Sequence, residues 1–176
     1  MNHSDLVDLL RGGVTTNGGH WADLGAGEGA FTLALADLLG PGAHITAVDK
    51  DSGAVRGLAA EIGKRFPATT IEVVVADFTR QLPIANLDGV VMANSLHFVR
   101  DKRPVLEKVR SMLRKGGSLI LVEYGADRGN PWVPHPTSYP RWKELAAQVG
   151  FENTRMLHSV PSRYLGSIYS AVSYSS

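Results

Sequence analysis

The fold is decided by one stretch of the sequence, His20-Trp-Ala-Asp-Leu-Gly-Ala-Gly-Glu-Gly29. It places three glycines at alternate positions, after a short apolar run and before a helical pattern. This order predicts a strand, a tight turn and the N-terminus of a helix. Because glycine has no Cβ, Gly25, Gly27 and Gly29 let the backbone turn sharply and let a ligand contact bare amides. We therefore expect the turn to hold a nucleotide-like cofactor.

The rest of the chain alternates short apolar runs with helical patterns, which indicates an α/β fold with a parallel sheet covered on both faces. Continuous Val and Ile runs are typical of strands that are buried on both sides. The predicted strands are residues 20–24, 44–48, 70–76, 88–93, 118–123, 152–158 and 164–173. The predicted helices are residues 4–11 (with Ser4 as a cap), 29–39, 52–63, 100–115 and 140–149.

Length and composition predict a single domain over residues 1–176, with residues 1–19 as a short N-terminal helical segment. With 44% apolar and 20% charged residues, the chain can bury a core. The absence of cysteine excludes disulfides, zinc–thiolate sites, thiol nucleophiles and cysteine-ligated iron–sulfur clusters. No apolar run approaches the roughly 20 residues that span a bilayer, and the first residues do not form a signal peptide. We expect a soluble, cytoplasmic protein with no membrane partner.

Charge is divided unevenly along the chain. Residues 1–99 carry 6 Lys/Arg and 11 Asp/Glu, whereas residues 100–176 carry 12 and 6. Seven of the basic residues lie between Arg100 and Lys115, where apolar residues recur at helical spacing. We interpret them as the solvated face of an amphipathic helix rather than as a nucleic-acid patch.

Asp23 refines the interpretation of the glycine turn. The pattern Asp23-x-Gly25-x-Gly27-x-Gly29 resembles motif I of the class I S-adenosylmethionine (SAM)-dependent methyltransferases. The same letters also fit a dehydrogenase pattern, Gly25-x-Gly27-x-x-Ala30, so the turn alone does not choose between the two. The resemblance to the methyltransferases extends along the whole chain. It implies a Rossmann-like, doubly wound sheet of seven strands in the order 3-2-1-4-5-7-6, with the last strand antiparallel to the others.

Further motifs carry this resemblance. Asp49 ends the second predicted strand 20 residues beyond Gly29, where a carboxylate accepts from ribose hydroxyls. Asp77 and Phe78 end the third, where the family places an acid for the adenine amino group and an apolar side chain for its ring. Residues 92–99 are similar to the segment that lines the methionine arm in a small-molecule, ubiquinone-biosynthesis-like group, and residues 113–121 resemble the turn into strand five. The cofactor implied is SAM, without a metal, and the implied contacts are Asp23, Gly25, Ala26, Gly27, Asp49, Lys50, Asp77, Phe78 and Asn94.

His97 is our candidate for a catalytic base, because histidine titrates near neutrality and this one follows the fourth predicted strand. A base is needed only for an acceptor that arrives protonated, such as an oxygen or carbon acid. The loop from Gly125 to Arg141 holds four prolines and is the expected cover of the acceptor side. Weaker candidates for shaping that pocket are Tyr124, Trp132, His135 and Tyr139.

The acceptor is predicted to be a small molecule. An Asn/Asp-Pro-Pro-Tyr motif would suit amine or amide methylation of nucleic acid or protein, and this chain has Asn94-Ser-Leu-His instead. Two alternatives stay open: a methyltransferase fold acting on RNA or protein, and a SAM-binding partner subunit without its own acceptor site. A nicotinamide-dependent oxidoreductase fits Asp23 and Asp77 poorly.

Overall fold

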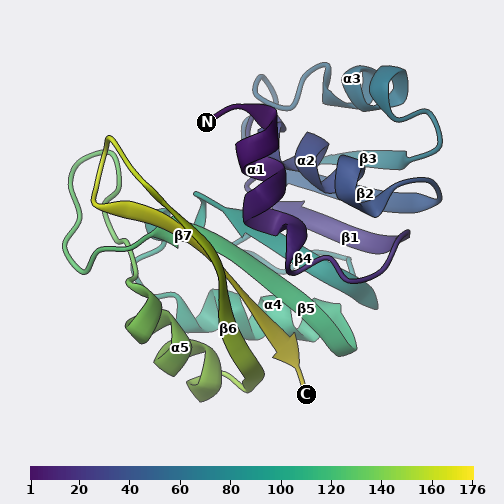
Figure 1. Cartoon of the computed structure of the whole chain (residues 1–176). Helices are drawn as coiled ribbons and strands as arrows, with labels where there is room; N and C mark the ends of the chain where they lie inside the picture. Colours follow the sequence, from purple (N-terminus) through teal and green to yellow (C-terminus); the bar gives the residue numbers. More distant parts are fainter.

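The computed structural model describes residues 1–176, which form one seven-stranded sheet with helices on both faces (Figure 1). The strands are β1 (Gly19–Leu24), β2 (Ala43–Asp49), β3 (Thr70–Val75), β4 (Leu87–Ala93), β5 (Leu113–Tyr124), β6 (Phe151–Pro161) and β7 (Ser167–Ser175). The helices are α1 (His3–Arg11), α2 (Ala30–Leu39), α3 (Leu58–Arg65), α4 (Arg103–Met112) and α5 (Tyr139–Gln148), with a short 3₁₀ helix, η1 (Leu96–Phe98), after β4.

The strand order is β3-β2-β1-β4-β5-β7-β6, which confirms the predicted topology. The first five strands pair in parallel, and β7 runs antiparallel between β5 and β6. Alternate side chains of the central strands therefore enter two different cores. On one face α1 and α2 pack over β1, β2 and β4, with α3 beside them on β2 and β3. On the other face α4 and α5 pack over β4, β5 and β7.

Several predicted boundaries are wrong: α4 begins at Arg103 and not at residue 100, β7 begins at Ser167 and not at residue 164, and the loop predicted over residues 125–141 ends where α5 begins at Tyr139. Three others are wrong for clear local reasons. The first helix is capped by Asn2 rather than Ser4, because Asn2 and Asp5 exchange hydrogen bonds in a capping box. Residues 52–57 form turns instead of helix, since the Asp51 carboxylate accepts from two amides there and Gly57 adopts φ +85°. α4 ends at Met112, and β5 begins at Leu113, which pairs with Leu87 across an irregularity in the register.

None of the helices has the length and apolar character needed to cross a membrane.

Candidate functional site

The carboxyl ends of β1, β2, β3 and β4 meet at a cleft of about 380 Å³. This is the edge where open α/β sheets bind ligands. Twelve residues line the cleft: Gly25, Gly27, Asp49, Lys50, Ala76, Asp77, Phe78, Thr79, Asn94, Ser95, Phe98 and Val99.

The glycine turn follows β1 as predicted, and each glycine has a different reason to be there. All three have positive φ, +81° at Gly25, +54° at Gly27 and +87° at Gly29. A Cβ on Gly25 would collide with the side chain of Ser95, and one on Gly29 would collide with Leu58. A Cβ on Gly27 would meet no atom within 4 Å, because this residue faces the open cleft. The turn thus presents bare backbone to a ligand.

Asp49 joins the end of β2 to this turn. Its Oδ2 accepts a hydrogen bond from the amide of Gly27 at 2.8 Å, and its Oδ1 accepts one from the amide of Asp51 at 2.9 Å. Each carboxylate oxygen keeps a second lone pair. The carboxylate is therefore held in place by the backbone while it can still accept from a ligand in the cleft.

Asp77 is fixed in a comparable way at the end of β3. Its Oδ1 accepts from the amide and the hydroxyl of Thr79, at 2.9 and 2.7 Å. These hydrogen bonds, that of the hydroxyl first, lower the pKa of Asp77, which is therefore ionised at neutral pH. Lys108 on α4 donates to the carbonyl of Thr79 at 2.7 Å and so ties the rim of the cleft to the helix layer.

Asn94 and Ser95 follow β4 on the opposite wall. Asn94 has φ +53°, and its Oδ1 is buried without a hydrogen-bond partner in the chain. Such an orphaned acceptor is costly unless something binds it. Ser95 donates its hydroxyl to the carbonyl of Leu24 at 2.8 Å, which fastens this segment to the end of β1. Together these contacts leave Asn94 as an acceptor that a donor group in the cleft can satisfy.

Asp23 is not part of the cleft wall. It is 1% exposed and accepts a hydrogen bond from the hydroxyl of Thr32 on α2 at 2.6 Å. Burial raises the pKa of Asp23 to about 6, which the Thr32 hydrogen bond opposes and the charge of Asp49 increases. Ala26 also lies outside the cleft wall, because its side chain packs toward α3 and β3.

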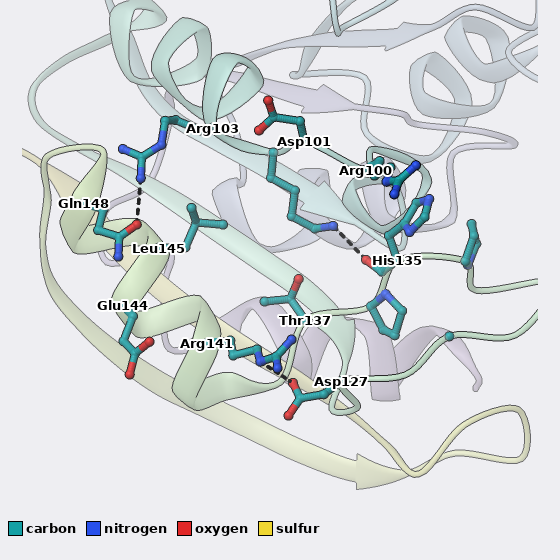
Figure 2. A pocket seen from close by; sticks show the side chains of 14 residues that line it. Arg100, Asp101, Arg103, Asp127, His135, Thr137, Arg141, Glu144, Leu145 and Gln148 are labelled. Atoms are coloured by element: carbon teal, nitrogen blue, oxygen red, sulfur yellow. Dashed lines mark hydrogen bonds and ion pairs between the residues drawn. The ribbon is translucent and has the colours of Figure 1, made fainter.

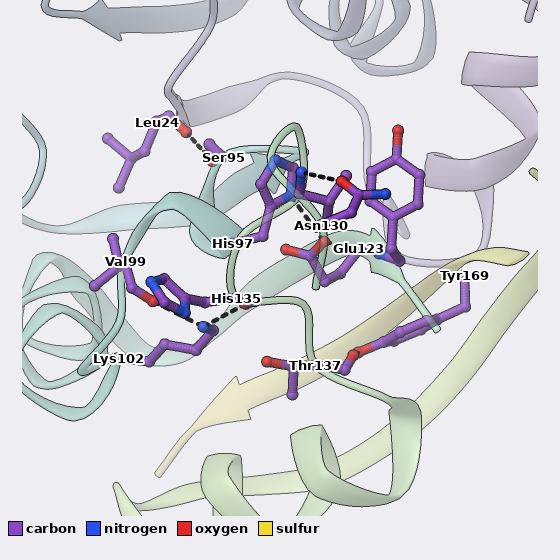
Figure 3. A network of polar contacts seen from close by, with 12 residues as sticks. Leu24, Ser95, His97, Val99, Lys102, Glu123, Asn130, His135, Thr137 and Tyr169 are labelled. Carbon is purple, nitrogen blue, oxygen red and sulfur yellow. Dashed lines mark hydrogen bonds and ion pairs between the residues drawn. The ribbon is translucent and has the colours of Figure 1, made fainter. Parts of the chain in front are cut away.

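His97 lies in η1 and is buried, with only 3% of its surface exposed (Figure 3). Its Nδ1 is 2.9 Å from Oε1 of Glu123, a residue of β5 that is fully buried. Since a carboxylate only accepts, this contact places the proton on Nδ1 and leaves a lone pair on Nε2. Phe98, which lines the cleft, packs its ring 4.4 Å from the imidazole between centroids. The imidazole therefore lies behind one wall of the cleft.

The loop between β5 and α5, residues 125–138, contacts the same segment. The amide of His135 donates to the carbonyl of His97 at 3.0 Å. On its outer side the loop borders a second, polar cavity of about 540 Å³ toward α4 and α5 (Figure 2). Arg141 pairs there with Asp127 at 3.3 Å, and Arg103 donates to Gln148 at 2.7 Å.

The four weaker candidates for the acceptor pocket are dispersed. Tyr124 is buried with its ring 5.6 Å from that of His97, whereas Trp132 is 73% exposed on the loop. His135 borders the second cavity, and Tyr139 packs on Tyr169.

The cleft thus brings together most of the predicted cofactor residues, namely Gly25, Gly27, Asp49, Lys50, Asp77, Phe78 and Asn94, and leaves out Asp23 and Ala26. Sequence reasoning missed Ser95, Phe98 and Thr79 on the wall, and Glu123 behind it. Glu123 carried a readable signal, because a lone acid at the end of an apolar strand is costly to bury without a partner.

The family model described as "Methyltransferase domain" matches residues 22–119. A probable cobalt-precorrin-6B C(15)-methyltransferase (decarboxylating) of Thermoplasma volcanium is 28% identical over 66% of this chain and 56% of its own length. A carboxy-S-adenosyl-L-methionine synthase of Chromohalobacter salexigens is 35% identical over 60% of this chain and 40% of its own length. The chain thus matches about half the length of these curated relatives.

Among solved structures, a SAM-dependent methyltransferase from Aquifex aeolicus superposes with a TM-score of 0.71 at 17% identity, over 100% of both chains. This likeness shows a shared fold. The family match covers more than half of the chain and includes the glycine turn and the ends of β2, β3 and β4. The chain belongs to the methyltransferase domain family.

Proposed function

We propose that this chain transfers a methyl group from SAM to a small-molecule acceptor, and that His97 removes a proton from that acceptor. The observation that carries the proposal is the convergence of the Gly25–Gly27 turn, Asp49, Asp77 and Asn94 on one cleft next to the His97–Glu123 pair. SAM would supply an electrophilic methyl group on a sulfonium.

The cleft residues fit the three parts of SAM. The bare backbone at Gly27 leaves room for the methionine part, and the unpartnered Oδ1 of Asn94 can accept from its ammonium group. Asp49 is positioned to accept from the ribose hydroxyls. Asp77, which is ionised, can accept from the adenine amino group, and Phe78 can pack on the ring.

Three further residues lie next to the proposed SAM contacts and contribute charge or shape to the site. Lys50 lines the cleft directly after Asp49 and places a positive charge at its rim, while Ala26 shapes the turn from behind. Asp23 puts a buried carboxyl under the turn, where its negative charge attracts the cationic methionine end. All three are part of the proposed cofactor site.

His97 is suited to proton removal. The buried carboxylate of Glu123 holds Nδ1–H and stabilises the imidazolium that forms when Nε2 accepts a proton. Nε2 makes no hydrogen bond within the chain, and 4% of the His97 side chain is exposed. The remaining requirement is to hold the acceptor close to the methyl group, which contributes roughly 7–11 kcal/mol in well-oriented reactions. Oxygen and carbon acids fit this arrangement best, because both must lose a proton.

The test combines binding and turnover. Calorimetry should show binding of SAM and S-adenosylhomocysteine but not of NADH, and methyl-labelled SAM should then be incubated with a phenol, an enolisable 1,3-dicarbonyl thioester and an alkylamine. We expect label in the phenol or the dicarbonyl compound. His97→Ala should lower that turnover by roughly 10²–10⁴-fold, and Glu123→Gln should lower it as well, with SAM affinity nearly unchanged in both variants.

The opposite results are equally specific. An NADH response without a SAM response would overturn the cofactor assignment. Label that appears only in RNA or protein, when a fractionated cell extract is offered, would replace the small-molecule acceptor by a macromolecule.

A further inference from the structure

Lys102 is a buried lysine whose ammonium group bonds only to backbone carbonyls. The residue is 8% exposed and immediately precedes α4. Its Nζ donates to the carbonyl of Val99 at 2.8 Å and to the carbonyl of His135 at 2.7 Å (Figure 3). A buried charge is tolerated only when it is well hydrogen-bonded or faces an opposite charge, so this placement demands an explanation.

The two carbonyls belong to segments that are distant in the sequence. Val99 directly follows η1, which carries His97, and His135 belongs to the loop of residues 125–138. The amide of His135 also donates to the carbonyl of His97. One ammonium group and one amide therefore fasten the loop to the two ends of the short segment 97–99. The ion pair of the loop, between Asp127 and Arg141 at 3.3 Å, lies at a different point.

Lys102 also lies within the electrostatic influence of Glu123, the acid behind His97. Burial lowers the pKa of Lys102, and the charge of Glu123 opposes part of that shift. Glu123 in turn uses Oε1 for His97 and for the amide of Tyr124, whereas its Oε2 is buried without a hydrogen-bond partner. No ion pair joins Lys102 to Glu123 directly, and the positive charge of Lys102 acts on this acid through space.

We propose that Lys102 is a positioning residue for the reaction: it fastens the 125–138 loop to the His97 segment and balances the charge of Glu123. The proposal rests on the proposed role of His97 as the base. This role requires no contact between Lys102 and SAM or the acceptor, because both hydrogen bonds of Lys102 go to backbone carbonyls of the chain.

The titratable groups around His97 are Glu123 and Tyr124 on β5, Tyr169 on β7, His135 in the loop and Lys102 itself. Removing the positive charge of Lys102 leaves Glu123 uncompensated, which favours proton uptake by its imidazole partner. The base would then be blocked by a proton at pH values where the wild-type protein has a free Nε2.

The experiment compares Lys102→Met, Lys102→Arg and a matched control, Lys143→Met, which removes an exposed lysine of α5. Hydrogen exchange should become at least about tenfold faster in peptides of the 125–138 loop in Lys102→Met, because each tenfold is only 1.4 kcal/mol of lost protection. The pH at which the imidazole NMR signals of His97 titrate should rise by about one unit. Lys102→Arg keeps the charge and two donors, so it should restore the His97 titration. Lys143→Met should change neither readout.

SAM affinity should stay within about twofold in every variant, while kcat falls and its rise with pH moves upward in Lys102→Met. Loop exchange that matches the wild type in Lys102→Met, or an unchanged His97 titration, would overturn the proposal. If Lys102→Met does not fold, the arginine variant decides: it must retain the wild-type His97 titration, and a shifted titration there would overturn the proposal too. Hydrogen exchange and NMR need no acceptor. Both measurements therefore test the role of Lys102 even if the wild-type protein methylates none of the compounds and the proposed function fails.

Discussion

The carboxylate of Asp49 accepts a hydrogen bond from the amide of Gly27 at 2.8 Å, and this contact connects the end of β2 to the turn after β1. The two residues are 22 positions apart in the sequence. Since the second oxygen of Asp49 holds the amide of Asp51, one side chain organises two backbone segments of the cleft. The residue proposed to bind ribose therefore also shapes the turn proposed to bind methionine.

Replacing Asp49 should weaken SAM binding by two routes. Asp49→Ala removes the proposed ribose acceptor and frees the amide of Gly27. A hydrogen bond to a charged group contributes roughly 1.5–3 kcal/mol, so affinity should fall at least about tenfold in a folded protein. Calorimetry with SAM measures this, and Asp51→Ala is the matched control, because its carboxylate contacts only its own turn. Equal affinity in Asp49→Ala and the wild type would place the ribose elsewhere.

The stability of a Gly25 variant measures how closely the glycine turn approaches Ser95, in the segment after β4. Gly25→Ala forces a Cβ into the side chain of Ser95 at φ +81°, whereas Gly42→Ala imposes the same φ with no atom within 4 Å. Both variants pay for the left-handed backbone, at about 1–2 kcal/mol. Only Gly25→Ala adds overpacking, at about 1–3 kcal/mol. Denaturant unfolding should therefore rank Gly25→Ala well below Gly42→Ala in stability, with SAM binding lost only in the former. Equal stability of the two would show that Ser95 moves away freely.

The sequence predicted those parts of the site that follow directly from a local pattern, such as an apolar run that ends in a glycine or an acid. The turn after β1 and the acids Asp49 and Asp77 stand at the ends of apolar runs, and parallel strands bring such ends to one edge. The pairing of His97 with Glu123 is harder to predict. The acid at the end of the apolar β5 run indicates that some partner is needed, but the sequence does not show that this partner is a histidine 26 residues away.

The helix that begins late shows the same limit. Residues 52–57 include two glycines, Gly53 and Gly57, which disfavour helix. The side chain of Asp51 also bonds to the amides of Gly53 and Ala54 and keeps them in turns. The prediction extended the helical pattern of residues 58–63 too far toward the N-terminus, because a pattern of apolar residues does not show this local competition.

His20 lies near the beginning of β1, away from the cleft, and we expect it to lower the folding stability in acid. Its ring lies 4.3 Å from that of His44 between centroids, and its Nε2 contacts the hydroxyl of Thr46 at 3.1 Å. Burial, and secondarily His44, lower the pKa of His20, although Glu72 and Asp88 oppose the shift. The unfolded state therefore binds a proton more readily, so this contribution to stability is present above about pH 6.5 and is lost as the pH falls below it.

His20→Gln should make the melting temperature less dependent on pH between about 7.5 and 5.5. Thermal unfolding at several pH values measures this, with His158→Gln, an exposed histidine of β6, as the control. A slope in His20→Gln that equals that of the wild type would assign the acid sensitivity to other groups.

Asp23 should make the folding stability depend on pH in the opposite direction to His20, and its replacement should affect folding stability and SAM binding differently. Its pKa is raised by burial to about 6 in the folded state, against 3.8 for the ordinary carboxyl. The folded state therefore holds the proton more tightly, and the stability that this gives below about pH 4 is lost as the pH rises through about 6.

Asp23→Asn removes the buried charge and keeps an oxygen that can accept from Thr32. At pH 8 the variant should be more stable than the wild type by about 1–3 kcal/mol, and the difference should shrink toward pH 4. The same variant should bind SAM more weakly, because the negative charge under the turn is gone. Urea unfolding and calorimetry at pH 4, 6 and 8 measure both effects, with the exposed Asp101→Asn as the control. A stability difference that does not change with pH would mean that the Asp23 carboxyl is not the titrating group.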